Sequence, residues 1–447
     1  MTAERSLVAS PDAAVAPSLL PDGAAFGADG RLSIAGVDML ELCREFGTPV
    51  FVYDEDHLRR RCREAVTAWG DGVAYASKAF LCTAMARLAV EEGLSIDVST
   101  GGELHVALAA GVPGERLVLH GNNKSEAELT RAIEVGVGRI VVDSFDELDR
   151  LERLAPPMGV RPDVLIRVTP GVEAHTHEYV RTGQDDSKFG FGLASGAAAD
   201  VAARLASPSS AVRLVGIHAH IGSQIFEPEF FALALGVIAP LVTELRLREL
   251  CIGGGLGVGY VAGEPTPSMG EWARRVRAAA LDAGLDPSVR LTAEPGRSIV
   301  ASAAVTCYTV GTIKAIPGVR TYVSVDGGMS DNPRPVLYGS GYEAFLARHG
   351  RAARPFVATV VGKHCESGDV IVRDAHLPAS VAVGDVLVTP VTGAYGHSMA
   401  SNYNKVPRPP VVFVSEGRTR VVVRRESYDD LVVQDVDEPF GGPSTPL

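Results

Sequence analysis

The sequence predicts an α/β protein made of a (β/α)8 TIM-type barrel followed by a C-terminal antiparallel β domain. Between residues 73 and 294, eight short apolar runs alternate with segments of helical periodicity. This alternation has the length and order of a (β/α)8 barrel. After residue 301 the helical pattern stops, and short β-rich runs are separated by Gly, Pro and Asp, which is typical of an antiparallel sheet. A doubly wound open sheet is the competing architecture, but it rarely needs eight such units.

The barrel strands are expected to be short, because each apolar run ends in polar or glycine residues after a few positions. The expected strands are Val73–Lys78, Leu94–Ser99, Leu117–Asn122, Arg139–Ser144, Asp163–Thr169, Leu214–Ile221, Glu249–Gly253 and Val289–Glu294. The helix-period segments between them include Thr83–Glu92, Glu103–Ala110, Ser125–Val135, Phe145–Leu154, Ala197–Leu205, Phe230–Leu245 and Glu271–Ala283.

The second half is expected to form a sheet from Val305–Ile313, Thr321–Val325, Phe356–Gly362, Val370–Arg373, Val386–Val391, Pro410–Ser415 and Arg418–Arg424. The run Val50–Tyr53 precedes the barrel without a helix of its own, so we expect it to pair with this sheet. Residues 1–30 begin with a stretch rich in Ala, Pro and Ser and are expected to form a disordered tail. The remaining boundaries are a segment over 31–56 that packs with the β domain, the barrel over 57–302 and the β domain over 303–447.

Composition excludes several classes of protein. The formal net charge of −12 argues against nucleic acid and against an anionic membrane surface as partners. No apolar run reaches the ~18 residues of a spanning helix, and the N-terminus lacks the layout of a signal peptide. The cysteines, at positions 43, 62, 82, 251, 307 and 365, are scattered without a CxxC pair. A reduced, cytoplasmic setting is therefore expected.

Lys78, in Tyr75-Ala-Ser-Lys-Ala-Phe80, lies where the first barrel strand gives way to a helix-like stretch. A partly desolvated amine can lose its proton and attack a carbonyl, which makes this lysine a candidate for Schiff-base chemistry. A solvated surface lysine is the ordinary alternative. The residues at the ends of the other strands favour the chemical interpretation.

Residues suited to binding or catalysis gather where (β/α)8 barrels assemble their active sites, at the carboxyl ends of the strands. They are His120 and Asn122 after the third strand, His218 and His220 on the sixth, Gly253-Gly-Gly-Leu-Gly257 after the seventh and Glu294-Pro-Gly-Arg297 after the eighth. Their shared location, rather than any one residue, indicates a site.

The glycine run and the Glu294 segment together indicate a phosphate-bearing cofactor. Backbone N–H groups of the glycines can approach a phosphate closely, although a lone glycine run is more often an ordinary turn. Glu294 can keep a pyridine nitrogen protonated, which makes pyridoxal phosphate a strong electron sink. Arg297 can clamp a phosphate or a carboxylate. A surface ion pair of Glu294 with Arg297 is the alternative.

His218 and His220 are two residues apart on a strand and therefore face the same side. Each is more often a core histidine than a functional one. A metal site is not expected, because no suitably placed carboxylate or cysteine completes a ligand set. An imidazole stacked on a cofactor ring is the better functional interpretation, with His220 nearer the strand end and Ser223 near the phosphate.

The β-rich half contributes a second set of candidates. Arg334 and Tyr338 lie in a turn-rich segment, where they either are solvated or bind a substrate carboxylate. Cys365 beside Glu366 offers a proton donor and an acceptor for an ammonium group, against the alternative of an inert core thiol. The hydroxyl of Tyr395 can donate to a phosphate.

With these residues together, the chain resembles the fold-type III pyridoxal-phosphate decarboxylases, most closely the meso-diaminopimelate decarboxylase family, from about residue 31 to 430. The motifs that carry the resemblance are Tyr75-Ala-Ser-Lys-Ala, Asp97-Val-Ser-Thr-Gly-Gly-Glu103, His120-Gly-Asn-Asn-Lys124, His218-Ala-His-Ile-Gly-Ser-Gln, Glu294-Pro-Gly-Arg, Val325-Asp-Gly-Gly-Met-Ser-Asp, Gly362-Lys-His-Cys-Glu-Ser-Gly-Asp and Ser398-Met-Ala-Ser-Asn-Tyr-Asn404.

The resemblance implies a pyridoxal 5'-phosphate cofactor joined to Lys78 as a Schiff base. It implies that His220 stacks on the ring and that Glu294 holds the ring nitrogen. The remaining cofactor-binding residues implied by the family pattern are Ser223, Gly253, Gly254, Gly255, Gly296, Arg297 and Tyr395. The implied substrate-binding residues are Arg297, Arg334, Tyr338, Glu366 and Tyr395, with Cys365 as the catalytic proton donor.

In this family Cys365 and Glu366 reach the partner subunit's site, so the resemblance implies a homodimer with active sites at the interface. The implied reaction is decarboxylation of a small-molecule amino acid, meso-2,6-diaminopimelate, to L-lysine and CO2, the last step of lysine biosynthesis. One departure is visible: Gly396 stands where many relatives carry cysteine. No chemistry is assigned to that position.

Three other functions compete with this one. Decarboxylation of ornithine, arginine or carboxynorspermidine would use the same scaffold, but Arg334 with Glu366 favours a substrate with both a distal carboxylate and a distal amine. An amino-acid racemase would need a tyrosine opposite Lys78, and none is convincing. A non-catalytic pyridoxal-phosphate carrier would have little use for the candidate residues after position 303.

Overall fold

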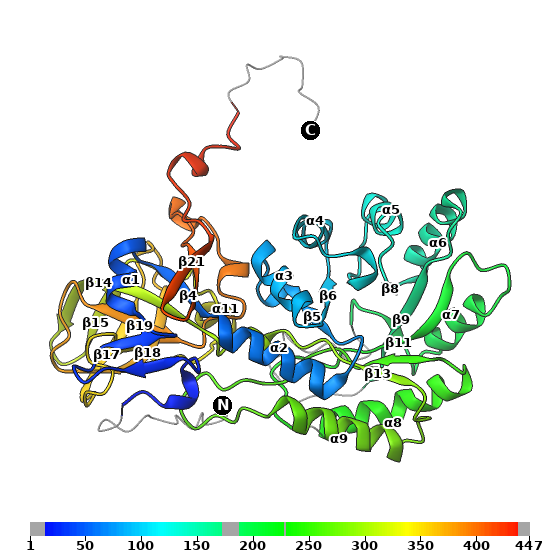
Figure 1. Ribbon diagram of the computed structural model, residues 1–447, viewed down its shortest axis with the longest axis horizontal. Coiled ribbons are helices and arrows are strands. Elements are labelled where there is room, and N and C mark those ends of the chain that lie inside the picture. Colours follow the sequence, from blue (N-terminus) through cyan, green and yellow to red (C-terminus); the bar gives the residue numbers. More distant parts are fainter. Residues whose placement is uncertain (1–13, 172–186, 228, 437–447) are drawn as a thin grey trace.

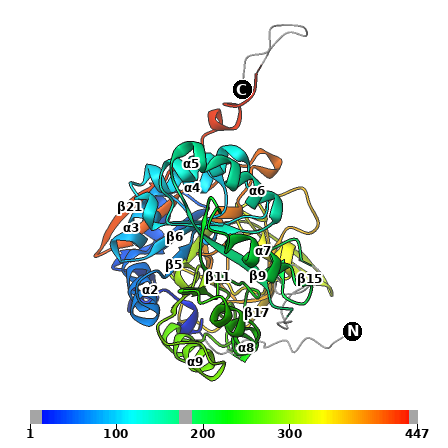
Figure 2. The same ribbon diagram turned by 90° about the vertical axis from the view of Figure 1, so that its right-hand side faces the viewer.

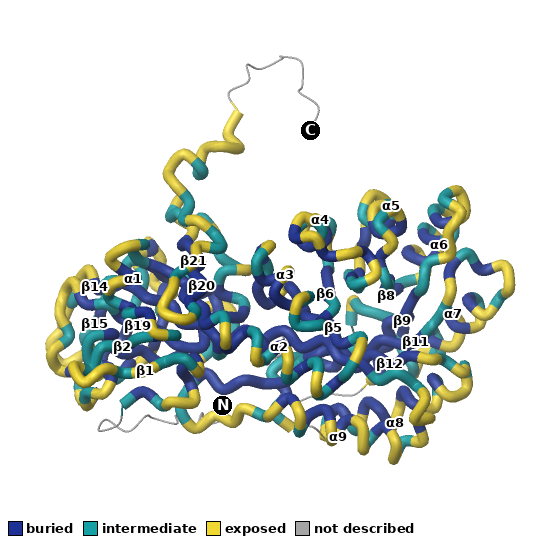
Figure 3. Tube along the Cα trace, viewed as in Figure 1, coloured by how far each residue is buried: buried dark blue, intermediate teal, exposed yellow. Residues whose placement is uncertain are grey.

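The computed structural model describes residues 14–171, 187–227 and 229–436. A barrel and a sheet domain lie side by side in it (Figure 1). Seen from the barrel side, helices surround the strands (Figure 2). The tube in Figure 3 is buried along the barrel strands and exposed along the outer faces of the helices.

The barrel contains eight parallel strands, which confirms the predicted fold. They are β5 (Ala74–Ala76), β6 (Ser95–Val98), β7 (Leu117–Leu119), β8 (Arg139–Val142), β9 (Asp163–Thr169), β11 (Arg213–His218), β12 (Glu249–Cys251) and β13 (Arg290–Thr292). Neighbours in the sheet follow the chain order from β5 to β13, and the short β10 (Phe191–Gly192) adds to β9.

Two backbone hydrogen bonds join the first and last barrel strands. The N–H of Ala74 donates to the carbonyl of Ala293 at 3.0 Å, and the N–H of Ala76 donates to that of Pro295 at 3.1 Å. This seam places the segment after β5, which carries Lys78, beside the segment after β13, which carries Glu294.

Helices connect the barrel strands, as the periodicity predicts. They are α3 (Thr83–Glu91), α4 (Gly101–Ala109), α5 (Glu126–Glu134), α6 (Phe145–Leu154), α7 (Ala197–Leu205), α8 (Glu229–Glu244) and α9 (Met269–Asp282). In addition, α2 (Glu55–Trp69) precedes β5 and the short α10 (Arg297–Val300) follows β13. Side-chain oxygens cap several N-termini; at α5, Ser125 and Glu128 form a reciprocal capping box. None of the helices in the described ranges is long and apolar enough to cross a membrane.

The second sheet contains β4 (Val50–Asp54), β14 (Ala304–Ile316), β15 (Arg320–Val325), β16 (Phe345–Leu346), β17 (Phe356–Val361), β18 (Val370–Leu377), β19 (Val386–Pro390), β20 (Val411–Ser415) and β21 (Arg418–Val423). Most pairs are antiparallel, but β15–β17 and β4–β20 are parallel. Their strands are far apart in sequence, so no tight hairpin imposes an antiparallel pairing. The run expected to join this sheet is its strand β4, which lies between β14 and β20.

The N-terminal segment departs from expectation. Disorder was expected through residue 30, yet Val15 and Leu19 are buried in the core. Strand β1 (Ala24–Phe26) pairs with β2 (Leu32–Ile34), which pairs with β3 (Val37–Asp38) ahead of α1 (Met39–Phe46). The prediction is therefore wrong for residues 14–30, because a few apolar side chains anchor a segment whose composition is typical of disorder. Residues 1–13 lie outside the described ranges.

Candidate active site

A cavity of about 420 Å³ lies where the carboxyl ends of the barrel strands meet loops of the sheet domain. Of the residues singled out in the sequence, its walls contain Lys78, His120, Asn122, His218, His220, Ser223, Gly254, Gly255, Glu294, Gly296, Arg297, Arg334, Tyr338 and Tyr395. The fold thus brings together residues that are up to 317 positions apart, from Lys78 to Tyr395.

Lys78 lies in a short 3-10 turn, Ser77–Ala79, directly after β5. The turn is fixed by the carbonyl of Ala79, which accepts hydrogen bonds from the N–H of Tyr395 at 2.8 Å and from Ser398 Oγ at 3.2 Å. The side chain is open to the cavity yet enclosed by the protein around it. Enclosure alone would lower the pKa of Lys78, but Tyr395 and Asp97 outweigh it and raise the pKa.

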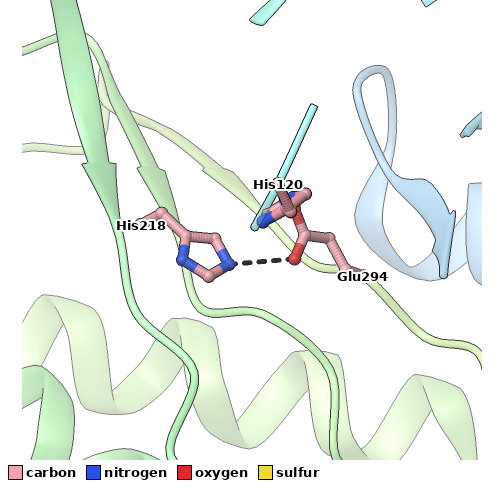
Figure 4. A group of neighbouring side chains, drawn as sticks. All are labelled: His120, His218 and Glu294. Atoms are coloured by element: carbon pink, nitrogen blue, oxygen red, sulfur yellow. Dashed lines mark hydrogen bonds and ion pairs between the residues drawn. The ribbon is translucent and has the colours of Figure 1, made fainter. Parts of the chain in front are cut away.

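Glu294 lies between two histidines (Figure 4). Its Oε1 is 2.9 Å from Nε2 of His120, and its Oε2 is 2.9 Å from Nε2 of His218. Burial alone would raise the pKa of Glu294, but the two imidazoles hold it well below its usual value. The carboxylate is therefore ionised and can only accept hydrogen bonds, so both Nε2 atoms carry protons.

The pKa values of the two histidines shift in opposite directions. Burial opposes a charge on His120, but Asp97, whose carboxylate is 3.7 Å away, and Glu294 raise the pKa of this imidazole. Burial lowers the pKa of His218 to about 4 in spite of Glu294. His218 is therefore the neutral ring of the pair at pH 7, while the pKa of His120 is shifted toward the charged form.

The carboxylate that appeared to be missing beside the histidines is Glu294. One possible ligand atom from each of Glu294, His120 and His218 lies within 4.8 Å of the other two, which is also the donor set of a His-His-Glu metal site. No ion is needed to satisfy these groups, since each carboxylate oxygen already accepts a hydrogen bond. The same arrangement suits a carboxylate that faces a ring nitrogen.

The glycines after β12 and β13 are sterically required. A Cβ on Gly254 would lie 2.3 Å from the carbonyl oxygen of Glu294, and one on Gly255 would lie 2.4 Å from that of Gly222. At Gly296 a Cβ would meet Ala76 at 2.9 Å. Gly253 does not line the cavity but has φ +67°, and a Cβ there would lie 2.7 Å from His220 Nδ1, which accepts from the N–H of Gly254 at 3.2 Å. The backbone therefore forms a cradle with no room for side chains.

Two buried guanidinium groups complete the walls. Arg297 donates to Tyr260 Oη at 2.6 Å and to Ser223 Oγ at 3.0 Å, while Arg334 donates to Ser340 Oγ at 2.9 Å. In the described part of the chain neither makes an ion pair with a carboxylate. Buried charges are normally paired, so this wall suits an anionic ligand with more than one negative group.

Several cavity residues did not emerge as candidates from the sequence, chiefly Arg167, Phe189 and Asp97. The guanidinium carbon of Arg167 lies 4.2 Å from the ring centroid of Phe189, and its Nη1 is 3.6 Å from Asp143 Oδ2. A sequence signal existed for Arg167, since it is one charge in the otherwise apolar middle of β9. Asp97 lies in a motif of the resemblance but was given no role. Burial raises its pKa to about 6, although His120 lowers it.

Cys365 and Glu366 are not part of this cavity in the single chain. Both are exposed on the loop between β17 and β18. The loop is ordered by Asn404 Oδ1, which accepts from the N–H of Cys365 at 3.1 Å, and by Asp369, which accepts from the N–H of His364 at 2.9 Å. Their roles in the site therefore stay predictions.

Comparison with known proteins places this cavity in a family. The sequence profile of the family "Pyridoxal-dependent decarboxylase, pyridoxal binding domain" matches residues 55–301. The diaminopimelate decarboxylase of Mycobacterium tuberculosis is 47% identical over 442 residues, which is 94% of this chain and 98% of that protein. That of Bacillus subtilis is 47% identical over 427 residues, covering 92% and 96%.

Solved structures similar to this chain belong to the same family. The diaminopimelate decarboxylase of M. jannaschii in complex with L-lysine has a TM-score of 0.86 at 33% identity, over 94% of this chain and 98% of that one. The Helicobacter pylori enzyme with L-lysine has a TM-score of 0.81 at 31% identity, over 88% and 98%. A lysine/ornithine decarboxylase from Vibrio vulnificus shares the fold alone, at 22% identity. The chain therefore belongs to the pyridoxal-dependent decarboxylases and, within them, to the diaminopimelate decarboxylase family.

Proposed function

We infer that this protein decarboxylates meso-2,6-diaminopimelate to L-lysine and CO2, the last step of lysine biosynthesis, with pyridoxal 5'-phosphate as cofactor. Relatives at 47% identity over nearly the whole chain carry the name of this enzyme. The observation in the structure that supports it best is the cavity itself. Its walls combine the Lys78 amine, an ionised Glu294 and two guanidinium groups that have no carboxylate partner among the described residues.

The residues present fit the cofactor. The backbone around Gly253, Gly254, Gly255 and Gly296 has no room for side chains, so a phosphate can approach its N–H groups closely. The buried guanidinium group of Arg297 adds a positive charge suited to phosphate. We assign Ser223 and Tyr395 to the same phosphate subsite, since Ser223 bonds to Arg297 and the Tyr395 ring lies 4.7 Å from its guanidinium carbon. Glu294 would hold the ring nitrogen and His220 would stack on the ring.

When bound, pyridoxal phosphate withdraws electrons from the bond that breaks as CO2 leaves. The chain's own contribution begins at Lys78 Nζ, which we assign to the covalent link with the cofactor. Lys78 must first release a proton, because its amine is charged at neutral pH. Arg297, Arg334, Tyr338 and Tyr395 would orient the substrate carboxylates, so that the bond to be broken is held in one direction.

We propose that Cys365 Sγ donates the proton that replaces CO2 on the substrate carbon. Glu366 would bind the distal ammonium group of the substrate. Both belong to the exposed loop outside the cavity, so we propose a homodimer in which this loop completes the partner's site. All six cysteines have free thiols, which supports the proposed reducing, cytoplasmic setting.

The test is to incubate the purified protein, loaded with pyridoxal phosphate, with meso-diaminopimelate, and to measure CO2 and lysine. The expected result is release of both in equal amounts. Lys78→Ala should abolish turnover and the visible absorption of the bound cofactor. The exposed Lys314→Ala is the matched control and should change neither. Turnover of ornithine or arginine in place of diaminopimelate would overturn the substrate assignment while leaving the cofactor in place.

A further inference from the structure

Both oxygens of the Glu294 carboxylate are held by imidazoles from different barrel strands. His120 follows β7, His218 ends β11 and Glu294 follows β13. The three side chains are at most 8% exposed, and each imidazole Nε2 is 2.9 Å from its own carboxylate oxygen (Figure 4). One hydrogen bond leaves a carboxylate free to turn about its terminal bond. Two bonds to different oxygens fix its plane as well as its position.

The imidazoles are themselves held in place. The two rings meet edge to face, with centroids 4.8 Å apart, and Asp97 Oδ1 lies 3.7 Å from Nε2 of His120. Residues at the ends of β6, β7, β11 and β13 therefore form one continuous cluster. A side chain that is fixed in this way is preorganised for a partner, because no reorientation is needed when the partner arrives.

We infer that His120 and His218 are positioning residues, which aim the Glu294 carboxylate at the ring nitrogen of the cofactor and keep a proton on that nitrogen. This inference rests on the proposed function for the cofactor, and it adds a task for two residues to which the sequence motifs give none. Neither histidine takes part in bond making in this role.

The electrostatics of the cluster favour this role. Titratable or charged groups that interact electrostatically with the cluster include Asp97 from β6, Lys78 after β5, Arg167 from β9, His220 after β11 and, through Asp97, Glu103 from α4. The two imidazoles keep Glu294 ionised, and an ionised carboxylate stabilises a protonated ring nitrogen beside it. A carboxylate that took up a proton itself would lose that effect.

His218 shows why the pair contains one neutral ring. Its Nδ1 is buried and has no hydrogen-bond partner among the described residues. A bare nitrogen lone pair tolerates this environment better than an N–H bearing positive charge, so the proton stays on Nε2, where Glu294 accepts it. The neutral imidazole of His218 thus donates to Glu294 without adding a positive charge beside the ring nitrogen.

The test uses His218→Leu and His120→Leu, which remove the donor, and His218→Gln and His120→Gln, which restore an N–H at similar reach. Each variant is loaded with pyridoxal phosphate carrying 15N in the ring, and the nitrogen chemical shift is measured by NMR. We expect the leucine variants to shift toward the value of an unprotonated nitrogen and the glutamine variants to recover much of the wild-type value. With diaminopimelate, kcat should fall about tenfold or more in the leucine variants, the effect of one lost charge-assisted hydrogen bond, while KM changes less.

His57→Leu is the matched control. His57 is another buried histidine whose pKa is lowered to about 4, but it lies outside the cavity, so its loss should leave the ring-nitrogen signal unchanged. Wild-type nitrogen shifts in the leucine variants would overturn the inference, as would equal losses in the leucine and glutamine variants. The proposed function fails separately, if the wild-type protein binds the cofactor but does not turn over diaminopimelate. The nitrogen shift still decides the role of the histidines in that case.

Discussion

Tyr260 links the two arginines of the cavity: its Oη accepts a 2.6 Å hydrogen bond from Arg297, and its ring lies 4.8 Å from the guanidinium carbon of Arg334. It is 3% exposed and follows the glycine loop after β12. Through this one side chain, the proposed phosphate subsite and the proposed substrate subsite share a support.

Tyr260→Phe should therefore weaken binding at both subsites while preserving the packing of the ring on Arg334. We expect the cofactor affinity to fall about tenfold and KM to rise about tenfold, which is the effect of one lost hydrogen bond to a charged group. Equilibrium dialysis of cofactor and steady-state kinetics measure it. Tyr53→Phe is the control, because it also removes one buried hydroxyl bond, at 2.8 Å to the carbonyl of Gly393. Equal effects of the two variants on KM would contradict the prediction.

Gly254→Ala should prevent tight binding of pyridoxal phosphate. Its Cβ would lie 2.3 Å from the carbonyl oxygen of Glu294, so the loop or the Glu294 segment must move. Cofactor absorbance after dialysis measures the loss. Gly236→Ala in α8 meets nothing within 4 Å and should raise the free energy of unfolding by about 0.5–1 kcal/mol. Retention of cofactor by Gly254→Ala would show that the cradle is not needed.

The proposed dimer predicts complementation between two inactive variants. Lys78→Ala removes the amine of the cavity, and Cys365→Ala removes the thiol of the exposed loop. When equal amounts are unfolded and refolded together, half of the dimers are mixed and each mixed dimer has one intact site, so about a quarter of the wild-type activity should return. If both residues act within one chain, the mixture stays as inactive as its parts.

His57 should make stability fall in mild acid. Burial lowers its pKa to about 4, against an ordinary value of 6.5, in spite of Asp22. The unfolded chain therefore binds the proton more readily between these values. The contribution of His57 to the free energy of unfolding is fully present above pH 6.5. It decreases by about 3 kcal/mol as the pH falls toward 4. His57→Asn keeps an acceptor for the N–H of Asp22 and should lose less stability than the wild-type protein over this pH range. Urea unfolding at pH 7, 5.5 and 4.5 measures the difference, and parallel curves for both proteins would refute it.

The strand pattern and the end-of-strand residues were predictable because both follow from local rules. Alternating apolar runs and helices specify the barrel, and a barrel places residues such as Lys78 and Glu294 at one end. The order of residues 14–30 was not predictable, since a few anchors such as Val15 decide it against the composition. The partners of Glu294 were not predictable either, because their contacts join strands that lie far apart in the sequence.

The seam that closes the barrel also sets an order of events. Lys78 follows β5 and Glu294 follows β13, the two strands that meet through the hydrogen bonds of Ala74 and Ala76. A growing chain has made the first of these residues more than 200 positions before the second. Contacts of such long separation form late and slowly. During synthesis and refolding, competence to bind cofactor should thus appear after most of the helices have formed, so that pyridoxal phosphate meets a finished barrel rather than a partial one.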